Sequence, residues 1–377
     1  MNQMQEPIIV SDPLSLHRAV QNLSQQPAIA IDTESNSLHA YHEQVCLIQI
    51  STSEEDYLID PLALKDLSGL KPVLADSAIQ KIFHAGDYDI ACLKRDFNFS
   101  FVNLFDTMLA ATALAEPNLG LSGLVEKYLH VTLEKKFQRA DWGARPLKPE
   151  MLAYAQADSH YLIALRDALV PLLKEKDRLS ILLEDSEALG LLTPAMKNHE
   201  ENLWRIKGVI NLKPRTLSLL QALNHTRELL ASAANLPIFK IISDQALIEI
   251  AQTEPKFIEE LSLLPSLSRG QVRRFGQKIM TTVDHWREKP AEIHRPRNGR
   301  LSAEQIERHE RLSEWRKLQG IAEGVPSNVI MPKELLDSLT SHPANSLGEL
   351  KQLMNLTPTR FERYGRQILT ILKEENQ

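Results

Sequence analysis

The stretch Ala28-Ile29-Ala30-Ile31-Asp32-Thr33-Glu34 decides the fold of the N-terminal half, because an apolar run leads directly into two acidic residues. Short apolar runs of this kind are typical of buried β-strands. Side chains two positions apart on a strand share one face, so we expect Asp32 and Glu34 to lie side by side. Such a pair suits a hard divalent cation. Acidic pairs also occur as solvated turn residues, so this pair alone does not establish a metal site.

Outward from this stretch, strand and helix signals alternate over about 170 residues. Further strand-like runs occupy residues 45–50, 57–60 and 81–84, and helical patterns occupy residues 61–75, 107–115, 120–128 and 149–174. Asp87 is placed to cap the helix that follows the last of these strands. The alternation predicts an α/β N-terminal domain with a mixed sheet flanked by helices.

After about residue 205 the strand signals end, and two helical segments repeat each other at an offset of 89 positions without a gap. Matching pairs include Leu223 and Leu312, Arg227 and Arg316, Pro237 and Pro326, and Gly276 and Gly365. A stretch rich in proline and charge separates the copies and is expected to be a linker. The predicted domains are therefore residues 1–204, 210–288 and 301–377, with the linker at residues 289–300.

Charge is divided unequally along the chain, although the total is −6. Residues 1–204 carry 17 Lys and Arg against 29 Asp and Glu, a net charge of −12, whereas residues 205–377 carry +6. An acidic half joined to a basic half indicates separate tasks, with nucleic acid as one partner of the basic half, or simply two differently charged surfaces. Only Cys46 and Cys92 occur, and no long apolar run or basic-then-apolar leader is present, so we expect a cytoplasmic protein without membrane association.

Further acidic residues and a tyrosine complete a pattern. Asp89 follows the strand-like run at residues 81–84, and Tyr154 and Asp158 stand four apart in a helical segment, on one helix face. Each feature alone is compatible with an ordinary surface. In order, however, the chain offers Asp-x-Glu on a strand, Asp after a later strand, and Tyr-x-x-x-Asp on a late helix.

This order resembles the tyrosine-bearing branch of the DEDD exonuclease superfamily. Residues 136–147 resemble the stretch that precedes the last motif in the ribonuclease D family, and the duplicated unit resembles the HRDC domain. The resemblance implies a ribonuclease H-like sheet followed by two all-α HRDC-like domains. One departure is Thr226-Arg227 in the first copy, where the second copy has Trp315-Arg316.

The resemblance also implies a chemistry. Asp32, Glu34, Asp89 and Asp158 would hold two divalent ions, Mg²⁺ or Mn²⁺, with Asp32 bridging them. Tyr154 would orient the attacking water, since a phenol with a pKa near ~10 is a poor base at neutral pH. The expected enzyme is a monomeric 3′→5′ exoribonuclease that trims RNA, with tRNA precursors as substrates.

Two other interpretations stay open: a DNA exonuclease with the same fold, and an RNA-binding scaffold without activity. Residues 119–123 contain two glycines but lack the lysine of a phosphate-binding loop, and we interpret His84 and Asp106 as structural. Candidate phosphate contacts are cationic residues in both halves: Lys135, Lys136, Arg139, Arg145, Arg274 and Arg363.

Overall fold

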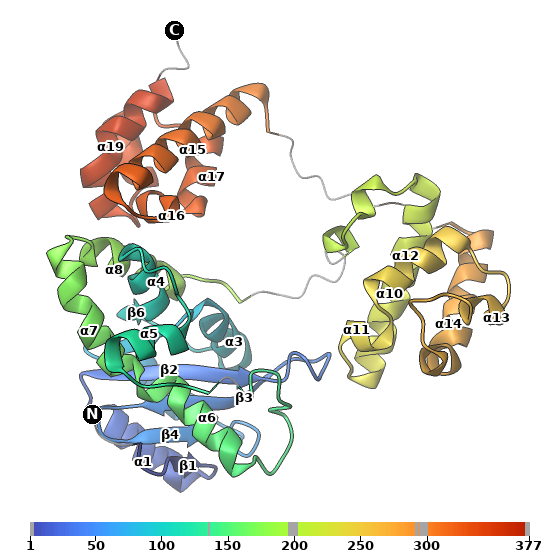
Figure 1. Ribbon diagram of the computed structural model, residues 1–377, viewed down its shortest axis with the longest axis horizontal. Coiled ribbons are helices and arrows are strands. Elements are labelled where there is room, and N and C mark those ends of the chain that lie inside the picture. Colours follow the sequence, from blue (N-terminus) through green and yellow to red (C-terminus); the bar gives the residue numbers. More distant parts are fainter. Residues whose placement is uncertain (1–3, 135, 195–202, 291–292, 294–300, 374–377) are drawn as a thin grey trace. The chain divides into compact units, whose positions relative to one another are not determined.

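The structure, a computed structural model, describes residues 4–134, 136–194, 203–290, 293 and 301–373 (Figure 1). The chain divides into two compact units. The first contains residues 1–34, 45–194 and 300–377, and the second contains residues 35–44 and 195–299. Most of the predicted linker lies outside the described residues. Among the helices of the described residues, none is long and apolar enough to cross a membrane.

The first unit contains a six-stranded mixed sheet in the order β1-β4-β3-β2-β5-β6, which confirms the predicted fold class. β3 and β4 are antiparallel, whereas β1–β4, β2–β5 and β5–β6 are parallel pairs. The strands are β1 (Ile8–Val10), β2 (Ala28–Ser35), β3 (Val45–Ser51), β4 (Asp56–Ile59), β5 (Gln80–Phe83) and β6 (Leu104–Asp106). The sequence did not predict the two edge strands, because each is only three residues long.

Successive side chains of β2 point to opposite faces of the sheet and pack in two separate core clusters. Ile29 and Ile31 pack in a cluster with side chains of α1 and α3. Ala28 and Ala30 pack with α4, α5 and α7. Asp32 and Glu34 continue the even-numbered row of this strand. The helices are α1 (Pro13–Leu23), η1 (Ser68–Leu70), α2 (Lys71–Ala75), α3 (Asp87–Phe97), α4 (Thr107–Ala113), α5 (Leu121–Leu129), α6 (Pro149–His160), α7 (Leu162–Glu175) and α8 (Leu179–Gly190).

Two predicted helices of this domain were wrong in extent. Residues 61–75 are helical only from Ser68, because the Asp60 carboxylate accepts hydrogen bonds from the backbone amides of Leu62 and Ala63 and forms a turn there. The segment 149–174 forms two helices, since α6 ends at His160 and α7 begins at Leu162. Helix α6 packs on strands β3 and β4, with Met151 and Ala155 against Leu47 and Leu58.

The two helical repeats have matching elements. The first contains η2 (Val209–Asn211), α10 (Pro214–Ala234), α11 (Ile238–Ile241), α12 (Asp244–Thr253), α13 (Ile258–Leu261) and α14 (Arg269–Glu288). The second contains α15 (Ala303–Glu323), α16 (Ser327–Ile330), α17 (Lys333–Ser341), α18 (Leu347–Leu353) and α19 (Pro358–Lys373). Arg227 donates to the carbonyl of Ile242, and Arg316, 89 positions later, donates to that of Met331. These repeated arginines therefore brace the repeat internally.

Within the first unit, the second repeat is joined to α8 by a buried ion-pair cluster. Arg360, at the start of α19, is 0% exposed and lies 3.0 Å from the Glu184 carboxylate and 2.7 Å from that of Asp185. Arg363 pairs with Asp177 at 2.8 Å. Apolar residues of both parts share one core cluster. A charge buried at such a contact is costly unless it is paired, so these pairs fix where α19 meets α8.

Candidate active site

The candidate site begins on β2. The side chains on one face of this strand are alanines at residues 28 and 30 and acids at residues 32 and 34. Asp32 and Glu34 lie in the strand itself, which extends to Ser35, and both are half-buried. Asp158, from α6, joins them: one ligand oxygen from each of the three carboxylates lies within 4.8 Å of the others. Residues 126 positions apart in sequence are thus brought into one acidic cluster by the packing of α6 on the sheet.

Asp89 reaches this cluster from the first turn of α3, where it is 8% exposed. The hydroxyl of Thr33, between the two strand acids, donates a hydrogen bond to its carboxylate. Thr33 was not predicted as a site residue, because its only signal in the sequence is its place between Asp32 and Glu34. A negative charge in the first turn is favoured by the helix dipole. Asp89 is therefore held by both α3 and β2.

The turn before α3 sets the direction in which the helix starts and so the position of Asp89. Ala85 has a φ of 57°, and a Cβ on Gly86 would lie 2.5 Å from that of Phe83, so this turn requires glycine at residue 86. Asp106 accepts from the Gly86 amide at 2.8 Å and caps α4, which confirms it as structural. Gly86 is the residue that precedes α3, so the prediction of Asp87 as the cap was wrong.

Tyr154 stands one turn before Asp158 on α6, and the two side chains are hydrogen-bonded. Phe137 and Trp142 pack against the tyrosine ring, with ring centroids 5.9 and 6.1 Å away. Residues 136–147 thus contribute aromatic walls that fix the phenol while its hydroxyl faces the carboxylates. His84, read as structural, has its Nδ1 2.9 Å from the Thr107 hydroxyl.

The electrostatics of the cluster favour bound cations. Burial, followed by the charges of Asp158 and Asp89, raises the pKa of Glu34 to about 9. Burial also raises the pKa of Asp158 to about 7 and that of Asp89 to about 6, and it lifts the pKa of Asp32 well above its ordinary value. Without counter-charge the cluster therefore holds protons at neutral pH, on Glu34 above all and in part on Asp158. Their oxygens form the hard donor set that Mg²⁺ or Mn²⁺ prefers, so the residues fit a divalent metal centre.

The cationic candidates lie in contrasting surroundings. Arg145 donates to the Asp60 carboxylate at 2.7 and 2.8 Å and to the Cys46 carbonyl. Arg363 is engaged with Asp177, while Arg274 is exposed and stacks over Phe275 at 5.1 Å. Lys136 lies over the Phe137 ring at 5.5 Å, and Arg139 is exposed. Lys135 lies outside the described residues.

Comparison with known families agrees with this geometry. A family model described as 3′-5′ exonuclease matches residues 7–174, and the HRDC domain model matches residues 216–283 and 305–372. Exosome complex exonuclease RRP6 of Saccharomyces cerevisiae is 35% identical over 241 residues, which cover 60% of this chain. The chain spans only about a third of the length of this protein and of two other curated relatives, from Arabidopsis thaliana and Caenorhabditis elegans.

Bacterial relatives match over more of their length. Ribonuclease D of Zymomonas mobilis is 33% identical over 281 residues, which cover 74% of this chain and 72% of that protein. The crystal structure of Escherichia coli RNase D, described as an exoribonuclease involved in structured RNA processing, matches 99% of this chain and 100% of its own. Its TM-score is 0.71 at 25% identity. These findings confirm the resemblance drawn from the motifs, and the chain belongs to the ribonuclease D family.

Proposed function

We propose that the protein is a metal-dependent 3′→5′ exoribonuclease. The observation that supports this most is the meeting of Asp32, Glu34, Asp89 and Asp158 beside Tyr154, from one strand and two helices. In the proposed reaction, the oxygen of a water molecule bonds to the phosphorus of the last phosphodiester. The 3′ oxygen of the preceding nucleotide leaves, and a nucleoside 5′-monophosphate is released.

Each residue has a distinct task in this proposal. The four carboxylates would hold the divalent ions, which would neutralise the acidic cluster and stabilise charge that develops on the phosphate. Burial and the charge of Asp158 raise the pKa of Tyr154 above its ordinary value. The phenol therefore stays protonated at neutral pH, and it positions the attacking water by hydrogen bonding instead of acting as a base.

RNA is the proposed substrate because proteins of the ribonuclease D and RRP6 types are the relatives that cover the chain. The acidic cluster does not distinguish RNA from DNA, since attack at the phosphorus does not require the 2′ hydroxyl. Precursor tRNA as the particular substrate, a monomeric state and a cytoplasmic location stay predictions.

The test compares release of mononucleotides from 3′-labelled RNA and DNA of one sequence, with and without Mg²⁺. The wild-type protein should degrade the RNA only when Mg²⁺ is present. Asp32→Asn should lower kcat by at least about 10²-fold with little change in RNA affinity, because the change removes a metal ligand. Glu126→Gln, at an exposed acid on α5, is the matched control. An Asp32→Asn protein that keeps more than about a tenth of the wild-type rate would contradict the metal-site assignment.

A further inference from the structure

A second polar cluster lies on the side of α6 that faces away from Tyr154 and Asp158. Gln156, Ser159 and His160 are spaced three and four residues apart, so they share one helix face. At 3.6 residues per turn, this face is about 180° around the helix from the face that carries Tyr154 and Asp158. Helix α6 therefore has polar side chains on two opposite sides.

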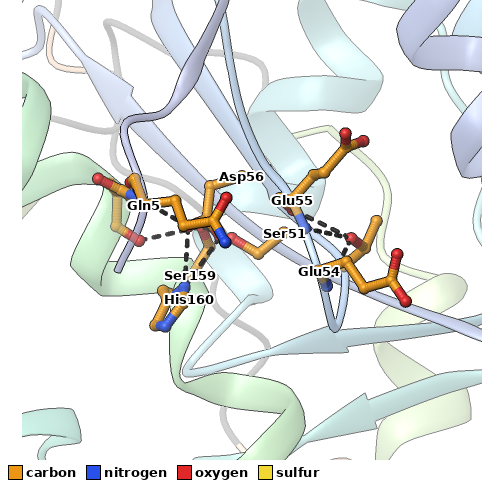
Figure 2. A network of polar contacts seen from close by, with 9 residues as sticks. Gln5, Ser51, Glu54, Glu55, Asp56, Ser159 and His160 are labelled. Carbon is orange, nitrogen blue, oxygen red and sulfur yellow. Dashed lines mark hydrogen bonds and ion pairs between the residues drawn. The ribbon is translucent and has the colours of Figure 1, made fainter. Parts of the chain in front are cut away.

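The partner of this second face is the end of the β3–β4 hairpin. Ser51 and Asp56 are opposite each other in the register of the two strands. The Asp56 carboxylate accepts from the Gln156 amide at 2.6 Å and lies 2.8 Å from Nδ1 of His160. The hydroxyls of Ser51 and Ser159 are 2.7 Å apart. Figure 2 shows Asp56, Ser51, Ser159 and His160 converging where the helix meets the hairpin.

These contacts are buried, so a change in the position of α6 would be costly. Asp56 is 7% exposed, Gln156 3%, and Ser51 and Ser159 at most 1%. Although burial alone would raise it, hydrogen bonds from His160, Ser51 and Gln156 hold the pKa of Asp56 below its ordinary value. A buried polar group that loses its partner costs about 1–3 kcal/mol, so a rotated or shifted helix would leave several such groups unpaired. The cluster thus selects one register of α6 on the sheet.

The apolar contacts of α6 do not supply this register by themselves. They come from Met151 and Ala155, which pack with Leu47 and Leu58, and Ala155 is the last buried apolar residue of the helix. Asp158 lies in the second half, between Gln156 and Ser159. Beyond Ala155, the buried attachments of α6 are therefore the hydrogen-bonded Gln156 and Ser159, which stand on either side of Asp158 in the sequence.

We propose that Asp56 is a positioning residue, which fixes the register of α6 through Gln156 and His160 and thereby places Asp158 and Tyr154 against Asp32 and Glu34. This inference rests on the proposed function, because it takes Asp158 as a metal ligand. Displacement by about 1 Å at a catalytic group is enough to cost about 10² in rate. Asp56 itself touches neither substrate nor metal in this scheme.

The experiment measures Asp56→Ala and the milder Asp56→Asn, with Glu54→Gln as a control at an exposed acid of the same hairpin. Folding is checked by circular dichroism, and assays are run well below each melting temperature. We expect kcat on RNA to fall about 10- to 100-fold for Asp56→Ala, with Kd for RNA within about twofold of the wild-type value. The Mn²⁺ affinity, measured by calorimetry without RNA, should weaken about tenfold, because Asp158 is no longer held at the cluster.

Combination of Asp56→Ala with Gln156→Leu provides a second readout. If Asp56 acts through Gln156, the double variant should lose no more activity than Asp56→Ala alone, since partners in one network are not additive. A folded Asp56→Ala protein with wild-type kcat and Mn²⁺ affinity would overturn the inference. Where the Asp56 variants do not fold, His160→Ala carries the same expectations and the same refutation. A wild-type protein that neither binds Mn²⁺ nor degrades RNA would instead refute the proposed function.

Discussion

The affinity of the acidic cluster for divalent ions should rise steeply with pH. At pH 7, Glu34, with a pKa of about 9, is protonated, and Asp158, with a pKa of about 7, is half protonated. The pKa of Asp32 is also raised well above its ordinary value. A cation binds the ionised carboxylates, so its binding must release these protons. Glu34 and Asp158 together account for about one and a half protons at this pH.

The size of the effect follows from proton linkage. Release of one proton makes the apparent affinity change about tenfold for each pH unit, which corresponds to about 1.4 kcal/mol. We therefore expect the Mn²⁺ affinity to rise at least about tenfold from pH 6 to 7 and about tenfold again from pH 7 to 8. The increase should level off above about pH 9, where Glu34 ionises without help.

Calorimetry in two buffers of different ionisation enthalpy measures the number of protons released. Glu34→Gln should lower that number by about one at pH 7, whereas Glu126→Gln should leave it unchanged. Carboxyl groups with raised pKa also make the folded protein bind more protons than the unfolded chain, so the stability of the metal-free protein should fall as the pH rises from about 4.5 to 9. Saturating Mn²⁺ should cancel most of this decline. A pH-independent Mn²⁺ affinity with no proton release would refute the electrostatic reasoning.

Three further predictions concern single residues. Tyr154→Phe should lower kcat about 10²–10³-fold with little change in KM, because only a positioned hydroxyl is lost. A wild-type rate in single-turnover assays would show that the Tyr154 hydroxyl has no role in catalysis. Arg274→Gln should weaken RNA binding and lower the number of ions released on binding by about one. The equivalent change Arg363→Gln should have a smaller effect, because Arg363 is paired with Asp177. Equal effects of the two changes in filter-binding titrations at several salt concentrations would contradict this distinction. Arg360→Met should lower the free energy of unfolding, measured in urea, by about 3–5 kcal/mol, because the carboxylates of Glu184 and Asp185 lose their partner. A loss below about 1 kcal/mol would show that the ion-pair cluster does not hold α19 on α8.

The sequence predicted the parts of the site that depend on local periodicity. Asp32 and Glu34 share a face because strands alternate every two residues, and Tyr154 and Asp158 share one because helices repeat every 3.6. Their meeting depends on contacts between segments more than a hundred residues apart. No local pattern encodes such contacts, so the expectation that all five side chains form one site came from the family resemblance.

Asp56 illustrates what the sequence hides. It follows Glu54 and Glu55, and three consecutive acids are more typical of a solvated turn than of a buried anchor. Its partners on α6 are about a hundred positions away. The β3–β4 register turns Asp56 inward opposite Ser51, and that register becomes visible only once the strands are paired.

One difference between the two repeats allows the second to pair with α8. Gln271 in the first repeat and Arg360 in the second are 89 positions apart, and each donates to a carbonyl of the short helix in its own repeat, that of Ile241 or Val329. The arginine adds length and charge, which reach Glu184 and Asp185 on α8. A glutamine at that position has no charge with which to make the same pairs, so both repeats have the internal hydrogen bond while the second is also fastened to α8. A truncation near residue 205 would remove Arg360, the partner of Glu184, so point substitutions at exposed residues of α14 such as Arg274 are the cleaner test of RNA binding by the first repeat.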